Sequence, residues 1–171
     1  MKLVTATILV ALAAACGGAP MSATDPGRPL DIERIHQAGR VKLSIPHDWQ
    51  VDDSAGDTLT ITAPDRTVSL EVTLIDGQDL AAALVGVAAG MLIGYDDLEL
   101  VGSPESASIN GMSALFQDGS GRYHGNEVAL SLGLIDTPAQ KYLLVVGEAE
   151  PGGFEAHRRA IRHFIEGIRP M

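Results

Sequence analysis

The chain has a single cysteine and little positive charge. Because Cys16 has no second cysteine to pair with, an internal disulfide is excluded, and the fold depends on an apolar core, which a chain of 171 residues can supply. Twelve lysines and arginines stand against 22 aspartates and glutamates, so the formal net charge is -10. Such a surface repels phosphate backbones at long range, and we predict no nucleic-acid partner.

The motifs of common enzyme classes are absent as well. The sequence has no G-x-S-x-G turn, no H-E-x-x-H motif, no P-loop and no G-x-G-x-x-G. The histidines lack the spacing of a zinc site, and His157 and His163, which are six residues apart, fall on different faces of a helix. We therefore predict no catalytic residue, no metal and no cofactor.

An N-terminal apolar run is present, but it is short. Lys2 is the only charge before Asp25, and residues 3–12 are mostly apolar. This order is typical of a secretory signal, and the run is too short to span a bilayer as a helix. We expect the chain to be exported from the cytoplasm.

Three alanines directly precede Cys16, and this segment resembles a bacterial lipobox. The resemblance implies that residues 1–15 are removed as a lipoprotein signal peptide and that lipid on Cys16 anchors the chain to a membrane. Ala13 stands where a lipobox usually has a large aliphatic residue, and a plain secretory signal is the alternative. The expected location is the cell envelope, lipid-anchored and facing outside the cytoplasm, in the periplasm or at the cell surface.

After the signal, the composition predicts a tether followed by one domain. Residues 16–37 are assigned to the lipidated cysteine and a flexible tether rich in Gly, Pro, Ser and Thr, although residues 31–38 carry a weak helix signal. Residues 38–171 are assigned to a single α+β domain.

Within that domain, alternation of apolar and polar residues predicts strands, and two stretches predict helices. Asn110-Gly111 indicates a hairpin turn, and residues 118–121 indicate another. A helix is expected over residues 79–93, capped by Asp76 or Asp79 and closed by a left-handed Gly94. Strands are expected over 41–45, 58–62, 67–74, 98–100, 112–116, 128–134 and 141–147, and a second helix over 154–168. The predicted fold class is α+β, with a mostly antiparallel sheet of about six strands and helices packed on it.

The segment VKLSIPHDW, residues 41–49, resembles the opening of the PsbP-like group, which includes DcrB-type envelope lipoproteins. The resemblance extends over about residues 38–169 in the order of strands and helices. It implies the PsbP-like fold and a non-catalytic accessory or adaptor role. Only Ile45, Pro46 and Trp49 can be matched to the group residue by residue. All three are expected to be structural, and Trp49 is expected to pack as a lid on the core.

Two features suggest where a partner binds. The helix over residues 80–93 has no charge, and Gly86 and Gly90 suggest close approach by another segment, because a mid-helix glycine is destabilising. The favoured interpretation is packing within the domain, and the alternative is a groove for a partner. The last helix carries Arg158, Arg159 and Arg162, which either dock an acidic partner or favour the helix dipole.

The leading hypothesis is a membrane-anchored, non-enzymatic envelope lipoprotein. It would act as a binding or adaptor module for a protein segment of another envelope protein or for a small apolar ligand. One alternative is an envelope hydrolase whose site forms only in three dimensions, for example from His124, Glu127 and an acidic turn. Another is a structural protein that oligomerises through the uncharged helix.

Overall fold

The computed structural model describes residues 31–77 and 79–171. Cys16, the signal peptide and most of the predicted tether lie outside the described residues. Within them, ten strands and two helices follow one another along the chain. Their order is β1 (Ile32–His36), β2 (Val41–Ile45), β3 (Gln50–Asp52), β4 (Leu59–Thr62), β5 (Val68–Ile75), α1 (Leu80–Met91), β6 (Asp96–Ile109), β7 (Met112–Tyr123), β8 (Asn126–Asp136), β9 (Tyr142–Ala149), α2 (Gly153–Glu166) and β10 (Arg169–Pro170).

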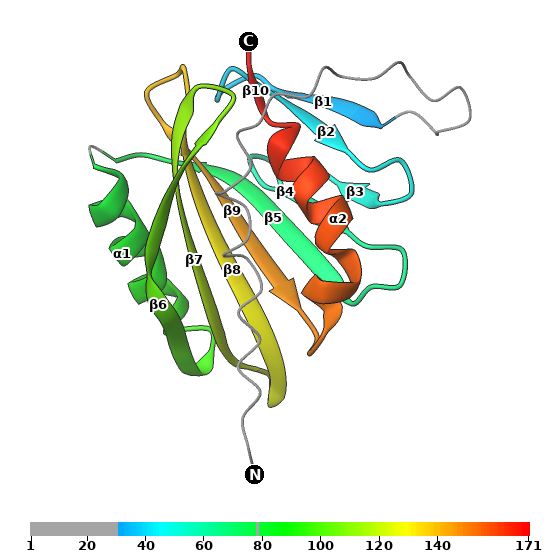
Figure 1. The fold of residues 1–171 in the computed structure, drawn as a ribbon, viewed down its shortest axis with the longest axis vertical. Coiled ribbons are helices and arrows are strands. Elements are labelled where there is room, and N and C mark those ends of the chain that lie inside the picture. The colour runs from blue at the N-terminus through cyan, green and yellow to red at the C-terminus, as the bar shows by residue number, and fades with distance from the viewer. Residues whose placement is uncertain (1–30, 78) are drawn as a thin grey trace.

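The strands form two sheets (Figure 1). The larger has seven strands in the order β3-β4-β5-β9-β8-β7-β6, and the smaller has three in the order β1-β2-β10. Every pairing between neighbouring strands is antiparallel. The predicted α+β class with antiparallel pairing is confirmed, whereas the second sheet and strands β1, β3 and β10 were not predicted.

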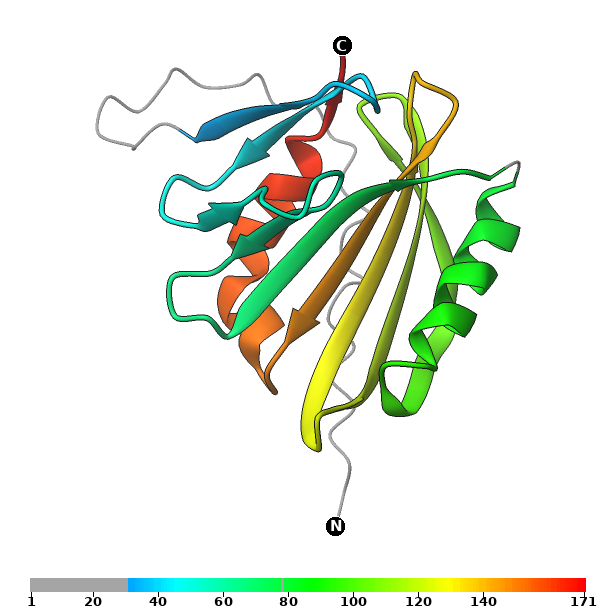
Figure 2. The same ribbon diagram turned by 180° about the vertical axis from the view of Figure 1, so that it is seen from behind.

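The two helices cover opposite faces of the larger sheet, as Figures 1 and 2 show from either side. Successive side chains of a strand point to opposite faces, and β8 displays this directly. Its Leu132 and Leu134 belong to the core that α1 covers, whereas Ile135 belongs to the core that α2 covers. No alternation of this kind is visible in the sequence of β9, because both of its faces are apolar.

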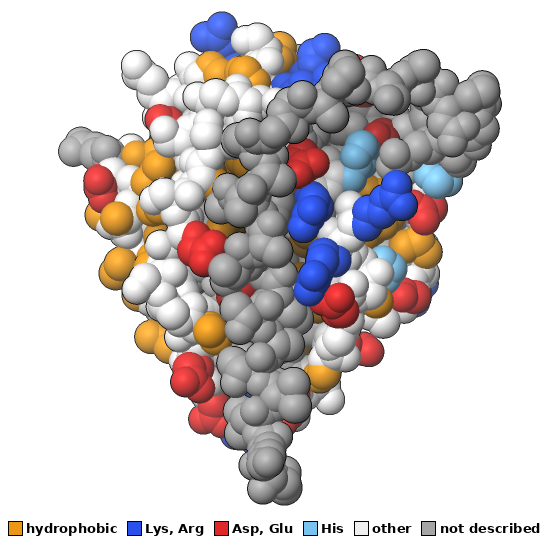
Figure 3. Space-filling model, viewed as in Figure 1, with side chains coloured by type: hydrophobic (Ala, Val, Ile, Leu, Met, Phe, Trp, Pro, Cys, Tyr) orange, Lys and Arg blue, Asp and Glu red, His pale blue; other side chains and the backbone are white. Residues whose placement is uncertain are grey.

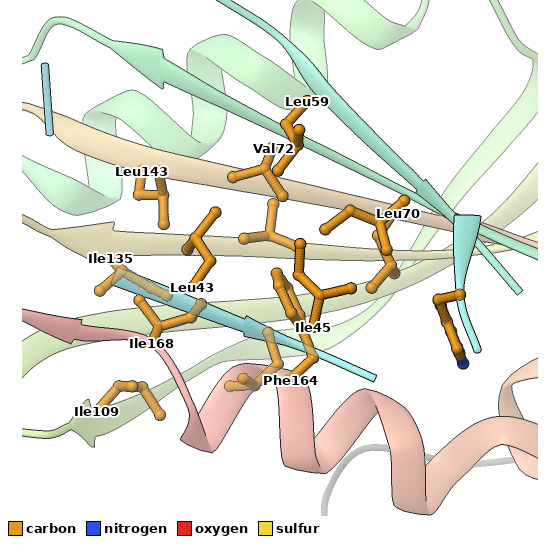
Figure 4. Packing of buried hydrophobic residues seen from close by; sticks show 14 of the residues in the cluster. Leu43, Ile45, Leu59, Leu70, Val72, Ile109, Ile135, Leu143, Phe164 and Ile168 are labelled. Carbon is orange, nitrogen blue, oxygen red and sulfur yellow. The ribbon is translucent and has the colours of Figure 1, made fainter. Parts of the chain in front are cut away.

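The larger core lies between the seven-stranded sheet, the small sheet and α2. The predicted alternation of β2 buries Val41, Leu43 and Ile45 in it. Figure 4 shows Leu43 and Ile45 of β2 meeting Phe164 of α2 above the strands of the larger sheet. Trp49 is 4% exposed and belongs to the same core, so the prediction that it packs as a lid is confirmed.

The smaller core lies under α1. Asp79 caps this helix as predicted, because its carboxylate accepts a hydrogen bond from the Ala82 amide at 2.8 Å. The buried side of α1 is an apolar stripe at helical spacing. Leu84 packs with Leu132 and Leu134 of β8, and Leu80, Val87 and Met91 line the contact. Neither described helix is long and apolar enough to cross a bilayer.

Of the two predicted hairpin turns, one is confirmed and one is wrong. Asn110 and Gly111 both have positive φ and join β6 to β7. The Asn110 side chain also donates to the carbonyls of Glu166 and Ile168, so this turn holds the end of α2. Residues 118–121 do not turn, because β7 pairs with β8 without a break, and the true turn is at His124-Gly125.

Two other predictions fail at the ends of elements. Gly94 has no positive φ, and α1 ends with Leu92 in the right-handed region. The amide of Gly94 then donates to the Met91 carbonyl at 2.9 Å. Residues 31–38 hold strand β1 and not a helix, because residues 32–36 pair with β2. The folded part therefore begins before the predicted boundary at residue 38.

Candidate functional site

The outer face of α1 carries the first pair of predicted binding residues. Gly86 and Gly90 are both exposed, and a methyl group built on either would meet nothing within 4 Å among the described residues. The favoured interpretation, that these glycines allow close packing within the domain, is therefore wrong for the part of the chain that the structure describes. Intramolecular packing does not explain why two helix-weakening residues stand here.

Exposed apolar side chains lie near these glycines in the chain. Val85 is 70% exposed, Leu92 is 61% exposed and Ile93 is 93% exposed. Soluble proteins expose single aliphatic residues routinely, but here one lies within a helix that has no charged residue and two directly follow it. We name the surface formed by Val85, Gly86, Gly90, Leu92 and Ile93 the outer face of α1.

The predicted arginines lie on α2, on the opposite face of the sheet (Figure 1), so the structure does not bring the two sets of predicted residues together. The arginines also differ from one another. Arg158 pairs with Glu155 one turn earlier, and both Arg158 and Arg162 are half-buried. Arg159 is exposed and lines a hollow in the surface.

This hollow contains three of the five histidines and has a volume of about 270 Å³. We name it the histidine hollow. Figure 3 shows histidines and basic side chains gathered on this face of the molecule. It forms where α2 faces the turn after β2 and the residue before β1. Its lining consists of Asp31, Pro46, His47, Asp48, Ala156, His157, Arg159, Ala160 and His163.

One wall of the histidine hollow is fixed by His157. The Nε2 atom of His157 lies 2.9 Å from Oδ2 and 3.0 Å from Oδ1 of Asp65. The His157 ring also meets the Trp49 ring edge-on, with centroids 5.6 Å apart. A carboxylate on one side and a buried aromatic on the other hold the imidazole in one orientation.

The opposite wall is fixed by His163. Its Nε2 atom is hydrogen-bonded to Asp31 Oδ2, and the Ser44 hydroxyl donates to that same oxygen at 3.2 Å. A loop residue, a strand residue and a helix residue thus meet at this wall. Both walls are therefore set by the fold before any ligand arrives.

The sequence does not predict this hollow. His157 and His163 are predicted to lie on different faces of a helix, and on an ideal helix they are about 120° apart. On the helix surface, Ala156 and Ala160 lie between the directions of these two histidines. Their short side chains leave space that forms the floor of the hollow, and both imidazole rings border it. His47 comes from the turn after β2, at a distance in sequence that no spacing rule detects. The sequence signal that indicates such a hollow is a pair of small residues, Ala156 and Ala160, that stand four residues apart among polar ones.

His157 also sets the charge state of Asp65. The hydrogen bond from the imidazole, followed by those from the amide and hydroxyl of Thr67, lowers the pKa of Asp65 from 3.8 to about 2. A folded-state pKa below the unfolded value means that the charged carboxylate stabilises the fold. That contribution is complete above about pH 4 and is lost as the pH falls through about 2.

We therefore expect the pH dependence of unfolding to differ between the wild type and Asp65→Asn. Urea unfolding should show the wild type to be more stable than the variant at about pH 5, with the difference vanishing near pH 2. Gln50→Ala, at an exposed residue that does not titrate, is the control and should change stability by a similar amount at both pH values. A constant difference across this range would contradict the His157–Asp65 interaction.

The residues considered for a hydrolase lie at one end of the larger sheet, where Arg122 of β7 is paired with Glu127 on one side and with Asp96 on the other. His124 is exposed in the β7–β8 turn and Glu127 is exposed at the start of β8. Neither borders the histidine hollow. Among the described residues, no group of three histidines, aspartates or glutamates is placed to hold a metal ion.

No family model and no curated protein matches the chain. Solved structures do match. The cyanobacterial PsbP protein, CyanoP, of Synechocystis superposes with a TM-score of 0.63 at 12% identity, over 90% of this chain and 100% of that one. The fold is PsbP-like.

Two further structures match. LpqN of Mycobacterium tuberculosis, described as involved in cell envelope biogenesis, has a TM-score of 0.57 at 19% identity, over 75% of this chain and 82% of that one. A protein of unknown function from Pseudomonas aeruginosa has a TM-score of 0.53 at 17% identity, over 81% and 95%. Identities this low establish a shared fold alone, and the DcrB-type part of the resemblance stays a prediction.

Proposed function

We propose that this chain is a membrane-anchored, non-enzymatic lipoprotein of the cell envelope that binds a helix of another envelope protein on the outer face of α1. The observation that carries the binding role is the open space over Gly86 and Gly90 beside exposed Val85, Leu92 and Ile93. Small residues one turn apart leave a shallow groove, into which the side-chain ridge of a second helix fits.

The nature of the partner follows from charge. The chain carries a net charge of -10, yet α1 has none, so this face is suited to an uncharged apolar segment. A short exported chain with lipid on Cys16 would present this face next to proteins of the same membrane. LpqN, which has the same fold, is described as involved in cell envelope biogenesis, and this supports an envelope location.

The arrangement of polar groups supports the non-enzymatic part of the proposal. In a serine hydrolase the nucleophilic hydroxyl is bonded to the imidazole, and the carboxylate orients that imidazole from its other side. Here the Ser44 hydroxyl donates to the Asp31 carboxylate itself. Asp31 lies between the hydroxyl and His163, so the imidazole is not placed to take a proton from Ser44.

The binding role is tested by photo-crosslinking from Ala89, an exposed position on α1, in cells of the source bacterium. We expect one discrete adduct with another protein, reduced severalfold by Gly86→Leu, because the added side chain fills the groove. Leucine favours the helix relative to glycine by about 1 kcal/mol, so the variant stays folded. Ala81→Leu is the matched control, since it adds bulk at an exposed site about 140° around the helix.

Two outcomes would contradict this proposal. No adduct from a folded, membrane-bound chain would exclude a helix partner at this face. An adduct of twice the mass of the chain would show a second copy there, which favours the structural oligomer over the adaptor.

A further inference from the structure

The histidine hollow has the features of a small-molecule site that is independent of α1. It lies on the α2 side of the larger sheet and its volume of about 270 Å³ approaches the lower end of the range of ligand pockets. Its lining comes from the start of the described chain, from the turn after β2 and from α2. Sites formed where separate elements meet present several polar groups to one ligand.

The walls of the hollow are ordered in advance. His157 is held by Asp65 and Trp49, and His163 is held by Asp31, which also accepts from Ser44. A ligand entering such a site does not have to immobilise these side chains, so less of its binding free energy is lost in ordering them.

Charge indicates which ligand fits. The two carboxylates of the lining each have a histidine beside them: Asp31 is bonded to His163, and Asp48 lies 3.9 Å from His47. Arg159 is the lining cation, it is exposed, and no hydrogen bond or ion pair engages it within the described part of the chain. The guanidinium of Arg159 is therefore the group of the lining that is open to an incoming anion.

We infer that the histidine hollow binds a small molecule through a carboxylate group that pairs with Arg159. A guanidinium fork matches a carboxylate with two parallel hydrogen bonds. A protonated imidazole of His157 or His163 has a second N–H, besides the one bonded to Asp65 or Asp31, and donates it to the same molecule. A dianion such as inorganic phosphate would bind less well, because Asp31 and Asp48 border the hollow and repel the additional charge.

The test uses benzoate as the probe, benzamide as its neutral counterpart, and inorganic phosphate. Nuclear magnetic resonance of the full-length chain would follow the imidazole signals of His47, His157 and His163. We expect benzoate to shift these signals saturably below about 20 mM, while benzamide and phosphate bind more weakly. Arg159→Gln should weaken benzoate binding about tenfold or more. Arg162→Gln, on the same helix but outside the hollow, is the matched control and should bind as the wild type does.

Three results would overturn the inference. They are imidazole signals that benzoate leaves unchanged over this range, binding of benzamide as tight as that of benzoate, and equal binding of benzoate by the Arg159→Gln and Arg162→Gln variants. Unaltered thermal unfolding of both variants would show that a change in binding is not a loss of fold.

Discussion

Phe164→Ala should lower the free energy of unfolding by about 3–5 kcal/mol, the typical cost of removing a buried phenylalanine ring. Phe164 is 1% exposed and lies where α2 meets the small sheet above the larger one (Figure 4). Removing the ring loses its transfer free energy and leaves a cavity, since Leu43 and Ile45 of β2 are held in place by strand pairing. A domain of this size has a total stability of about 5–15 kcal/mol, so the variant would lose a large share of it.

Urea unfolding followed by circular dichroism measures this effect. Val85→Ala is the control, because this apolar side chain is 70% exposed on α1 and its loss should change stability by less than about 0.5 kcal/mol. Similar values for the two variants, or a loss below about 1 kcal/mol for Phe164→Ala, would mean that α2 is not packed as described.

The fold was predictable where a local pattern agreed with the final structure. Period-two alternation located β2, β4, β5 and β8, and the helix predicted over residues 79–93 is α1. Strands β3 and β10 have three and two residues, too few for an alternation to be recognised. Strand β1 has five residues, but its sequence, IERIH, does not alternate between apolar and polar residues. They are strands because β2 and β4 supply pairing partners.

The wrong turn at residues 118–121 has a tertiary cause. Asp, Gly and Ser in a row are turn residues by local chemistry. In the structure a Cβ on Gly119 would lie 3.0 Å from the Glu99 carbonyl oxygen, and one on Gly121 would lie 3.3 Å from that of Asp96. These glycines serve close approach of the β6 backbone, which a single sequence does not distinguish from a turn.

The outer face of α1 and the histidine hollow also differ in whether the sequence alone predicts them. The outer face of α1 was visible in sequence, because a charge-free helix with two glycines is a local feature. The histidine hollow was not, since it combines Asp31, His47 and α2 residues that only the fold brings together. Of the predicted arginines, Arg159 alone borders it.

Cys16→Ser should remove the chain from the membrane, which is the largest cellular effect that we expect of any substitution. Two or more acyl chains on one residue give stable anchoring, whereas a polypeptide of net charge -10 has no electrostatic attraction to an anionic bilayer. Loss of the sulfur therefore removes the attachment that the lipobox predicts.

The most direct test is metabolic labelling with a palmitate analogue in bacterial cells that express the chain, followed by separation of membranes from soluble envelope contents. We predict that the wild-type chain is labelled and sediments with membranes, and that Cys16→Ser is unlabelled and soluble. A Cys16→Ser chain that also carries Ser22→Cys should behave like Cys16→Ser, because a cysteine outside the lipobox is not a substrate. An unlabelled wild-type chain in the soluble fraction would show a plain secretory signal and contradict the lipoprotein account.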